Sequence, residues 1–292
     1  MGKLERIGNI RGQVGEGPVW SAAEACWYWV DIPARLIWRL DAASGATRCW
    51  QTAEMPACLA PRAGGGLIAG MQSGLFHLQL REDGQVQAAR LACPPELGEG
   101  MRFNDGRTDR QGRFWAGTMF MDMAAARAVG GLYRWDGSLS APLVSGLLTQ
   151  NGLAFSPDGR TLYLSDSHPL RQLVWAFDLD PASGALSRQR VLVDMKPLPG
   201  RPDGAAMDVD GCYWVCGNDG GMILRFSPEG RLVGQIAVPM AKPSMCAFGG
   251  ARMDQLLVTS IAAGQPEDDP WAGAVLLIEA GVQGMADVPC AF

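Results

Sequence analysis

Four short polar segments recur along this 292-residue chain, and each places a carboxylate or an amide at or near a glycine. The segments are Gly15-Glu16-Gly17-Pro18, Arg102-Phe103-Asn104-Asp105-Gly106, Gln150-Asn151-Gly152 and Pro202-Asp203-Gly204. Glycine permits tight backbone geometry, and polar loops between apolar strands often carry binding and catalytic residues. We therefore expect these segments to be loops that converge on one site.

The chemistry that such a site could perform follows from its residue types. Glu16, Asn104, Asn151 and Asp203 offer carboxylate and amide oxygens, a hard ligand set that suits Ca²⁺, Mg²⁺ or Mn²⁺ and holds Zn²⁺ less selectively. A divalent ion with open positions polarises a carbonyl, and a carboxylate such as Asp203 can act as a general base. Arg102 adds a forked donor for substrate hydroxyls or a carboxylate.

The same residues also have a purely structural interpretation. Asn-Gly and Asp-Gly are ordinary turn dipeptides, so spacing alone makes Asn151 and Asp203 typical of turns. Glu16 is harder to explain in this way, because glutamate is not a turn former. The residues by themselves leave both interpretations open.

Segments so far apart in sequence can meet only if a repeated architecture brings them together. Short aromatic or β-branched runs are centred on Tyr28, Ile68, Trp115, Tyr163, Trp214 and Leu257, at spacings of 40, 47, 48, 51 and 43 residues. A second strand-like run follows each centre, and most second runs end at a turn such as Ala43-Ser44-Gly45. Six such repeats predict an all-β, six-bladed β-propeller, with residues 1–292 as one domain.

The propeller explains how the polar segments could converge, because loops that enter the innermost strands at one end point toward the central axis. The predicted metal site therefore lies on that axis. A pair of β-sandwiches does not repeat six times, and a β-helix has a shorter period. The best helical candidate is the stretch 119–128, which we expect to form a loop or short helix on one face of the propeller.

Composition narrows the possible partners and location. The chain is 48% hydrophobic and 19% charged with a net charge of -5, which suits a globular protein. No basic cluster is present, so we expect no nucleic-acid partner, and no apolar run is long enough to cross a membrane. Residues 1–10 lack the apolar core of a signal peptide, and none of the eight cysteines forms a Cys-x-x-Cys pair. These features favour a cytoplasmic protein with reduced structural thiols.

Several motifs resemble the gluconolactonase, regucalcin (SMP-30) and luciferin-regenerating-enzyme family, and they occur in the order that the family shows. They include Gly15-Glu16-Gly17-Pro18-Val19-Trp20, Arg102-Phe103-Asn104-Asp105-Gly106, Ala116-Gly117-Thr118-Met119, Asn151-Gly152-Leu153, Pro202-Asp203-Gly204 and Asn218-Asp219-Gly220-Gly221. The resemblance covers nearly the whole chain and also implies a six-bladed propeller.

The resemblance further implies roles for individual residues. A divalent metal is expected on the axis, held by Glu16, Asn151 and Asp203, with Ca²⁺ as the leading ion and Zn²⁺, Mn²⁺, Mg²⁺ or Fe²⁺ as alternatives. Asp203 is expected to be the catalytic carboxylate, while Asn104 and Arg102 contact the substrate.

The same resemblance points to a lid and to one further substrate contact. Asp122 stands nearest the place where some relatives use a glutamate to contact substrate, and residues 120–130 would form a Met- and Ala-rich lid. His168, which precedes Pro169, is a further candidate for lining the site.

The implied reaction is hydrolysis of a sugar lactone, such as glucono-, galactono-, xylono- or arabinonolactone, to the aldonic acid. We expect the protein to act on this small molecule as a monomer or small homo-oligomer. One alternative is a calcium-binding or scaffold propeller without turnover. Another is a hydrolase of phosphotriesters or acyl-homoserine lactones, but such relatives carry histidines in the site and His168 has no histidine partner.

Overall fold

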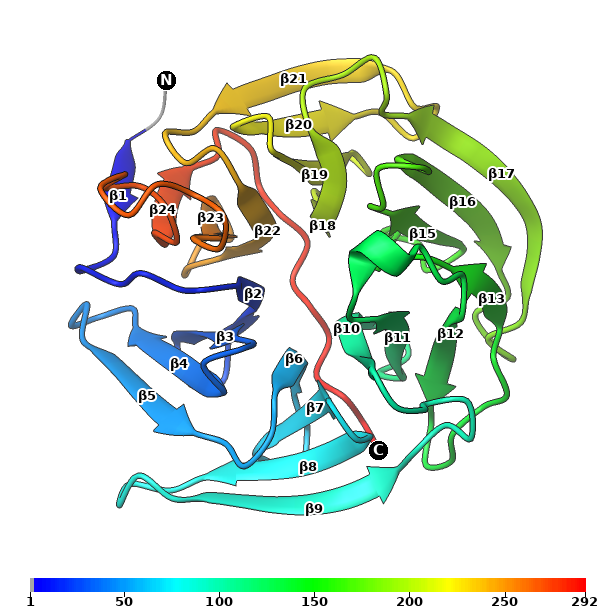
Figure 1. The fold of residues 1–292 in the computed structure, drawn as a ribbon, viewed down its shortest axis with the longest axis horizontal. Coiled ribbons are helices and arrows are strands. Elements are labelled where there is room, and N and C mark those ends of the chain that lie inside the picture. The colour runs from blue at the N-terminus through cyan, green and yellow to red at the C-terminus, as the bar shows by residue number, and fades with distance from the viewer. Residues whose placement is uncertain (1–2) are drawn as a thin grey trace.

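Each predicted repeat folds as one four-stranded antiparallel sheet, and the sheets are arranged radially as the blades of a six-bladed propeller (Figure 1). The computed structural model describes residues 3–292. The runs recognised in the sequence are the second and third strands of the blades, while the innermost strands are formed largely by the polar segments and the residues that follow them. The predicted propeller is thereby confirmed.

The strands follow one another outward from the axis within each blade. The first three blades contain β2 (Gly15–Ser21), β3 (Cys26–Asp31), β4 (Leu36–Asp41), β5 (Thr47–Gln51), β6 (Pro56–Pro61), β7 (Leu67–Met71), β8 (Leu75–Leu80), β9 (Val86–Ala92), β10 (Met101–Thr108), β11 (Phe114–Phe120), β12 (Gly130–Trp135) and β13 (Val144–Leu147). The fourth and fifth contain β14 (Gln150–Phe155), β15 (Thr161–Asp166), β16 (Leu173–Leu179), β17 (Leu186–Asp194), β18 (Arg201–Met207), β19 (Tyr213–Asn218), β20 (Met222–Phe226) and β21 (Leu232–Ala237).

The sixth blade is completed by the beginning of the chain. It contains β22 (Pro243–Gly249), β23 (Gln255–Ser260) and β24 (Leu276–Glu279), and its outermost strand is β1 (Leu4–Arg6). Leu4 pairs with Ile278 and Arg6 with Leu276, in antiparallel register. This strand, which the sequence analysis did not predict, pairs the beginning of the chain with β24 and closes the ring (Figure 1).

The innermost strand of every blade has one extra residue relative to its neighbour, at the same level of the propeller. In the first blade Glu16 pairs with Val30, but the next regular pair joins Val19 to Tyr28. The same shift occurs in β6, β10, β14, β18 and β22. An extra residue of this kind is a β-bulge, which bends the strand and redirects its side chains.

The bulges correct our prediction that the polar segments are loops. Glu16, Asn104, Asn151 and Asp203 all lie within innermost strands, at or next to the bulge. Gly152 after Asn151 has a φ of +60°, a conformation that glycine adopts readily. The Asn-Gly pair therefore serves a bulge here and not a hairpin turn.

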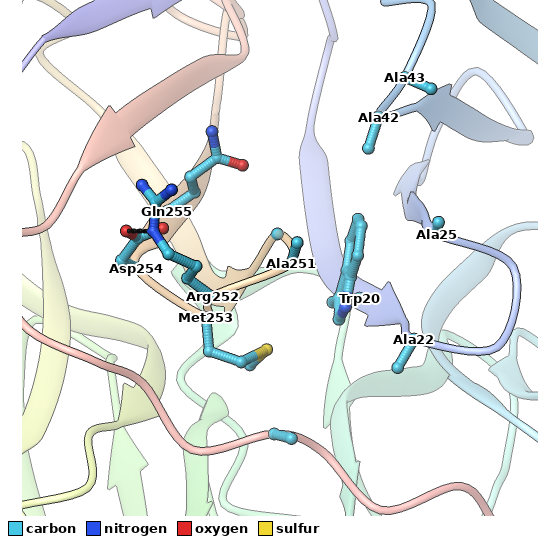
Figure 2. Close-up of a pocket in the computed structure, with 12 residues that line it drawn as sticks. Trp20, Ala22, Ala25, Ala42, Ala43, Ala251, Arg252, Met253, Asp254 and Gln255 are labelled. Atoms are coloured by element: carbon cyan, nitrogen blue, oxygen red, sulfur yellow. Dashed lines mark hydrogen bonds and ion pairs between the residues drawn. The ribbon is translucent and has the colours of Figure 1, made fainter.

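A hollow of about 640 Å³ lies where the β2–β3 and β22–β23 hairpins turn, and Figure 2 shows it lined by small side chains around Trp20 and Met253. The two charged side chains that line this hollow, Arg252 and Asp254, form an ion pair with each other at 2.8 Å. Trp20 is near the end of β2, whereas Glu16 is near its beginning. The hollow thus lies on the face away from the polar residues.

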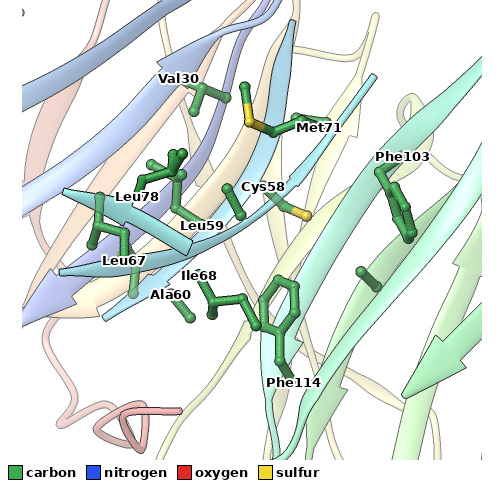
Figure 3. Close-up of a cluster of buried hydrophobic side chains, with 14 of the residues drawn as sticks. Val30, Cys58, Leu59, Ala60, Leu67, Ile68, Met71, Leu78, Phe103 and Phe114 are labelled. Carbon is green, nitrogen blue, oxygen red and sulfur yellow. The ribbon is translucent and has the colours of Figure 1, made fainter. Parts of the chain in front are cut away.

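Apolar side chains fill the spaces between neighbouring blades. Figure 3 shows one such cluster, in which Val30, Leu59, Ile68 and Phe103 come from the first three blades. Burying side chains of this size contributes roughly 1.5 to 3 kcal/mol each. The eight cysteines are free thiols, as predicted. Within residues 3–292, no helix has the length and apolar character needed to cross a membrane.

Candidate active site

A cavity of about 180 Å³ lies at the end of the propeller where the innermost strands begin. Side chains from every blade except the second line it, and they include all four polar residues singled out in the sequence. The lining consists of Val14, Glu16, Ile32, Arg102, Asn104, Met119, Met121, Met123, Thr149, Asn151, Ser167, Arg201, Asp203, Asn218 and Ile261. The second blade contributes no polar group because Ala57 occupies its bulge.

The two carboxylates in this cavity are buried. Glu16 and Asp203 are only 8% and 5% exposed. Burial raises the pKa of Glu16 well above its ordinary value, and the negative charges of Asp203 and Asp105 raise it further. Burial also raises the pKa of Asp203 to about 7, although Arg201 and a hydrogen bond from Asn218 act in the opposite direction. Both groups therefore favour the presence of a nearby cation.

The amides of the third and fourth blades are joined by a chain of hydrogen bonds. Arg102 donates from Nη1 to Oδ1 of Asn104 at 2.6 Å, and Asn104 donates from Nδ2 to Oδ1 of Asn151 at 3.0 Å. Asn151 in turn donates from Nδ2 to Oγ of Ser167 at 2.5 Å. The chain fixes the orientation of Asn151, whose Oδ1 accepts from Asn104 and can accept from one further partner.

Arg102 is a permanent cation among these groups. Burial lowers its pKa to about 10, while the charges of Glu16 and Asp203 act to raise it. The guanidinium therefore stays protonated at neutral pH and partly balances the two carboxylates. Its bond to the backbone oxygen of Phe103, at 2.8 Å, holds it close to the strand.

The sequence analysis assigned no role in the site to four polar residues that line the cavity, Thr149, Ser167, Arg201 and Asn218. Asn218 donates from Nδ2 to Oδ2 of Asp203 at 2.5 Å, and Arg201 donates from Nη1 to the backbone oxygen of Ser167 at 3.1 Å. Asn218 ends β19, directly after an apolar strand. The sequence shows a polar residue at that position, but it does not show that Asn218 contacts Asp203 in the neighbouring strand.

Asp122 and the predicted lid are placed differently from the polar residues of the strands. Asp122 is exposed and is not among the residues that line the cavity; it caps the 3₁₀ helix η1 (Met123–Ala125) by accepting a bond from the amide of Ala124 at 3.0 Å. Met121, beside it, does line the cavity. A contact between Asp122 and substrate stays a prediction.

His168 is attached to this same segment. It is 6% exposed, and its Nε2 lies 2.9 Å from the backbone oxygen of Met123, to which it donates. Its Nδ1 accepts a bond from the amide of Leu170 at 3.2 Å. The imidazole therefore connects the fourth blade to the predicted lid and does not belong to the lining of the cavity.

The residues that could hold a metal form a mixed set. Within residues 3–292 no cluster of three or more His, Cys, Asp or Glu side chains is placed to bind a metal. Glu16, Asn151 and Asp203 instead combine carboxylates with an amide oxygen around one cavity. This donor chemistry fits a hard divalent cation such as Ca²⁺, and a bound cation would stabilise the charged forms of two carboxylates that burial disfavours.

Comparison with known proteins gives an independent view of the chain. Residues 14–262 match the family described as the SMP-30/gluconolactonase/LRE-like region. A 6-deoxy-6-sulfogluconolactonase from Pseudomonas putida is 39% identical over 94% of this chain and 94% of its own. An L-arabinolactonase from Azospirillum brasilense is 32% identical over 98% of this chain and 94% of its own.

The solved structures agree with these relatives. A luciferin-regenerating enzyme superposes with a TM-score of 0.90 at 26% identity, covering 100% of both chains. Because the named relatives include several lactonases, the prediction that the chain is a lactonase enzyme is confirmed. The chain belongs to the SMP-30/gluconolactonase/LRE-like family.

Proposed function

We propose that this protein hydrolyses a sugar lactone to the open aldonic acid, with a divalent metal held on the propeller axis. The observation that carries the proposal is the buried cavity in which Glu16, Asn151 and Asp203 lie beside Arg102 and Asn104. The relatives are named for different sugars, a sulfonated gluconolactone and L-arabinolactone. The shared class is a sugar lactone, and glucono-, galactono-, xylono- and arabinonolactone are the substrates to test.

Glu16, Asn151 and Asp203 are the residues that would hold the metal. Their oxygen donors favour Ca²⁺, with Mg²⁺, Mn²⁺, Zn²⁺ or Fe²⁺ as alternatives. A bound divalent ion supplies Lewis acidity toward the lactone carbonyl. Asn104 orients one of these proposed ligands, because it donates a hydrogen bond to Oδ1 of Asn151.

Asp203 is the proposed general base. Its carboxylate can take a proton from water as the water attacks the lactone carbonyl. Asn218 holds one carboxylate oxygen of Asp203 and leaves the other to face the cavity. The proton taken by Asp203 is then available for the ring oxygen as the lactone opens.

Arg102 and Asn104 are the proposed substrate contacts. The guanidinium of Arg102 is oriented by bonds to Phe103 and Asn104, and a planar donor of this kind suits neighbouring hydroxyl groups. The thioethers of Met119, Met121 and Met123 line the side of the cavity nearest the predicted lid. They would shield the bound lactone from bulk solvent.

The proposal is tested by measuring acid release with a pH indicator on a panel of five- and six-membered aldonolactones, with spontaneous hydrolysis subtracted. We expect saturable turnover of at least one sugar lactone and none of a phosphotriester. If no lactone on the panel is hydrolysed in the presence of any of the five metals, the proposed function is wrong.

A further inference from the structure

Two arginines occupy the same position in two different blades. In β10, Arg102 pairs with Met119, and the bulge begins after the next residue of the strand. In β18, Arg201 pairs with Asn218, and the bulge again begins after the next residue. Each precedes a polar residue of the site by two positions, and both line the cavity. The propeller therefore places a guanidinium on each of two sides of one small cavity.

The two guanidinium groups differ in their charged neighbours. The charge of Arg102 lies close to Glu16 and Asp203. The side chain of Arg201 is 22% exposed and is paired with Asp219. Arg201 donates from Nε to Asp219 at 2.8 Å and from Nη2 to Oδ1 of Asn218 at 3.4 Å. These bonds hold the guanidinium plane in a fixed orientation.

Arg201 retains both positive charge and donor capacity. Asp219 is shared between Arg201 and Lys242, whose Nζ lies 3.9 Å from it, so this trio carries a net positive charge. A guanidinium has more N–H groups than the acceptors supplied by Asp219, Asn218 and Ser167 occupy. The N–H groups that remain are available to a ligand in the cavity.

Arg102 is the other cation that lines the cavity, but its charge already lies close to the two carboxylates Glu16 and Asp203. Met121 and Met123 line the side of the third blade, and Ile32 and Ile261 line the side of the first and sixth blades. A charged substituent on the substrate would lose hydration against these apolar walls without gaining a partner. On the side of Arg201 the same substituent would gain charge-assisted hydrogen bonds.

We propose that Arg201 is a specificity residue that binds an anionic exocyclic group of the lactone, so that the preferred substrate is a sugar lactone bearing a sulfonate or a carboxylate. This inference rests on the proposed function. The lactone ring lies between Arg102 and Asp203, and the anionic group extends toward Arg201 and the positive charge shared with Lys242. A planar carboxylate and a tetrahedral sulfonate satisfy the same N–H groups, and the experiment distinguishes them.

The test compares three lactones that differ only at the exocyclic position: glucono-1,5-lactone, 6-deoxy-6-sulfoglucono-1,5-lactone and the corresponding lactone with a carboxylate at that carbon. We expect the wild-type kcat/KM to be at least about 10-fold higher for one anionic lactone than for the neutral one. Arg201→Met should reduce that ratio by roughly 10-fold to 100-fold, mainly through KM, and Arg201→Lys should restore part of it. The preferred anion identifies the group.

Two controls separate recognition from structure. Arg252→Met replaces an arginine whose side chain is 84% exposed on the opposite face. It should leave kcat/KM unchanged for all three lactones. Calorimetric titration with the hydrolysed products, in the presence of metal, should show that Arg201→Met weakens binding of the anionic product more than that of gluconate. This readout does not depend on turnover.

The outcomes distinguish failure of the inference from failure of the proposed function. If wild type hydrolyses none of the three lactones, the proposed function itself fails. If wild type hydrolyses all three equally well, or Arg201→Met lowers every rate by the same factor, the inference is overturned. A uniform loss of rate in Arg201→Met would mean that Arg201 acts only by positioning Asn218 and, through Asn218, Asp203.

Discussion

Asn218 donates a hydrogen bond from its side-chain amide to Oδ2 of Asp203 at 2.5 Å. The two residues lie in adjacent strands of the fifth blade, β19 and β18, and both line the axial cavity. Arg201 donates in turn to Oδ1 of Asn218, which determines which end of the amide faces Asp203. One oxygen of the Asp203 carboxylate is therefore held in place by a side chain of the neighbouring strand.

This relationship predicts a catalytic cost for losing Asn218. Asn218→Ala should lower kcat on the preferred lactone roughly 10-fold to 100-fold, because a hydrogen bond to a charged group contributes about 1.5 to 3 kcal/mol. Asn218→Asp should be at least as damaging, since a second carboxylate would repel Asp203. Steady-state kinetics measure the effect, with the melting temperature as a check on folding. Wild-type kcat in Asn218→Ala would remove Asn218 from the mechanism.

Asp203 itself should be indispensable. Asp203→Asn keeps the shape of the side chain but removes its ability to accept a proton, so turnover should be abolished while the fold is retained. The check is lactone hydrolysis together with a circular dichroism spectrum. A variant that is folded and keeps more than about a tenth of wild-type kcat would show that another group is the base.

The buried carboxylates also predict how the stability of the metal-free protein depends on pH. An aspartate in the unfolded chain ionises near pH 4, whereas Asp203 in the folded protein keeps its proton up to about pH 7. Between these values the folded state binds more protons than the unfolded state, so the free energy of unfolding should fall as pH rises. The contribution of Asp203 should be roughly 1 to 4 kcal/mol.

Urea unfolding in EDTA at several pH values from 4 to 8 would measure this dependence. The comparison with Asp203→Asn isolates the contribution of Asp203 from that of other ionisable groups. We expect the wild type to lose more stability across this range than the variant. Parallel slopes for the two proteins would show that Asp203 does not retain its proton in the folded state.

Arg102 should affect binding of hydroxylated substrates. Arg102→Ala should raise KM for aldonolactones more than for an aliphatic lactone without hydroxyls, because its guanidinium is the proposed partner of the hydroxyl groups. Some loss of kcat is expected for both substrates, since Arg102 also orients Asn104. Initial rates on the two lactones measure the difference. Equal increases in KM would exclude Arg102 from substrate recognition.

The propeller could be predicted because its repeats are long and regular, with aromatic centres such as Tyr28, Trp115 and Trp214. The closing strand β1 could not, since it has only three residues, Leu4–Arg6, and its pairing with β24 depends on the assembled ring. The polar segments were assigned to loops because Asn-Gly and Asp-Gly occur in turns and bulges alike. Only cross-strand register separates these two cases.

The site could be predicted in part for similar reasons. Glu16, Asn104, Asn151 and Asp203 could be chosen because each is a carboxylate or an amide at or near a glycine in a polar segment, and the structure brings them to one cavity. Asn218, although part of a motif, and Arg201 were not assigned to the site because their roles depend on pairing with each other across β18 and β19. The position of Asp122 in the sequence did not reveal where its side chain lies. Met121 lines the cavity, whereas the neighbouring Asp122 caps a 3₁₀ helix.

The most direct test of the central claim is lactone turnover during removal and restoration of the metal. Wild-type protein dialysed against EDTA should lose activity and recover it when one of Ca²⁺, Mg²⁺, Mn²⁺, Zn²⁺ or Fe²⁺ is titrated back. Glu16→Gln, at a proposed ligand, should need at least about 10-fold more metal for half recovery. Full activity in EDTA, or identical metal titrations for wild type and Glu16→Gln, would contradict a metal-dependent lactonase site on the propeller axis.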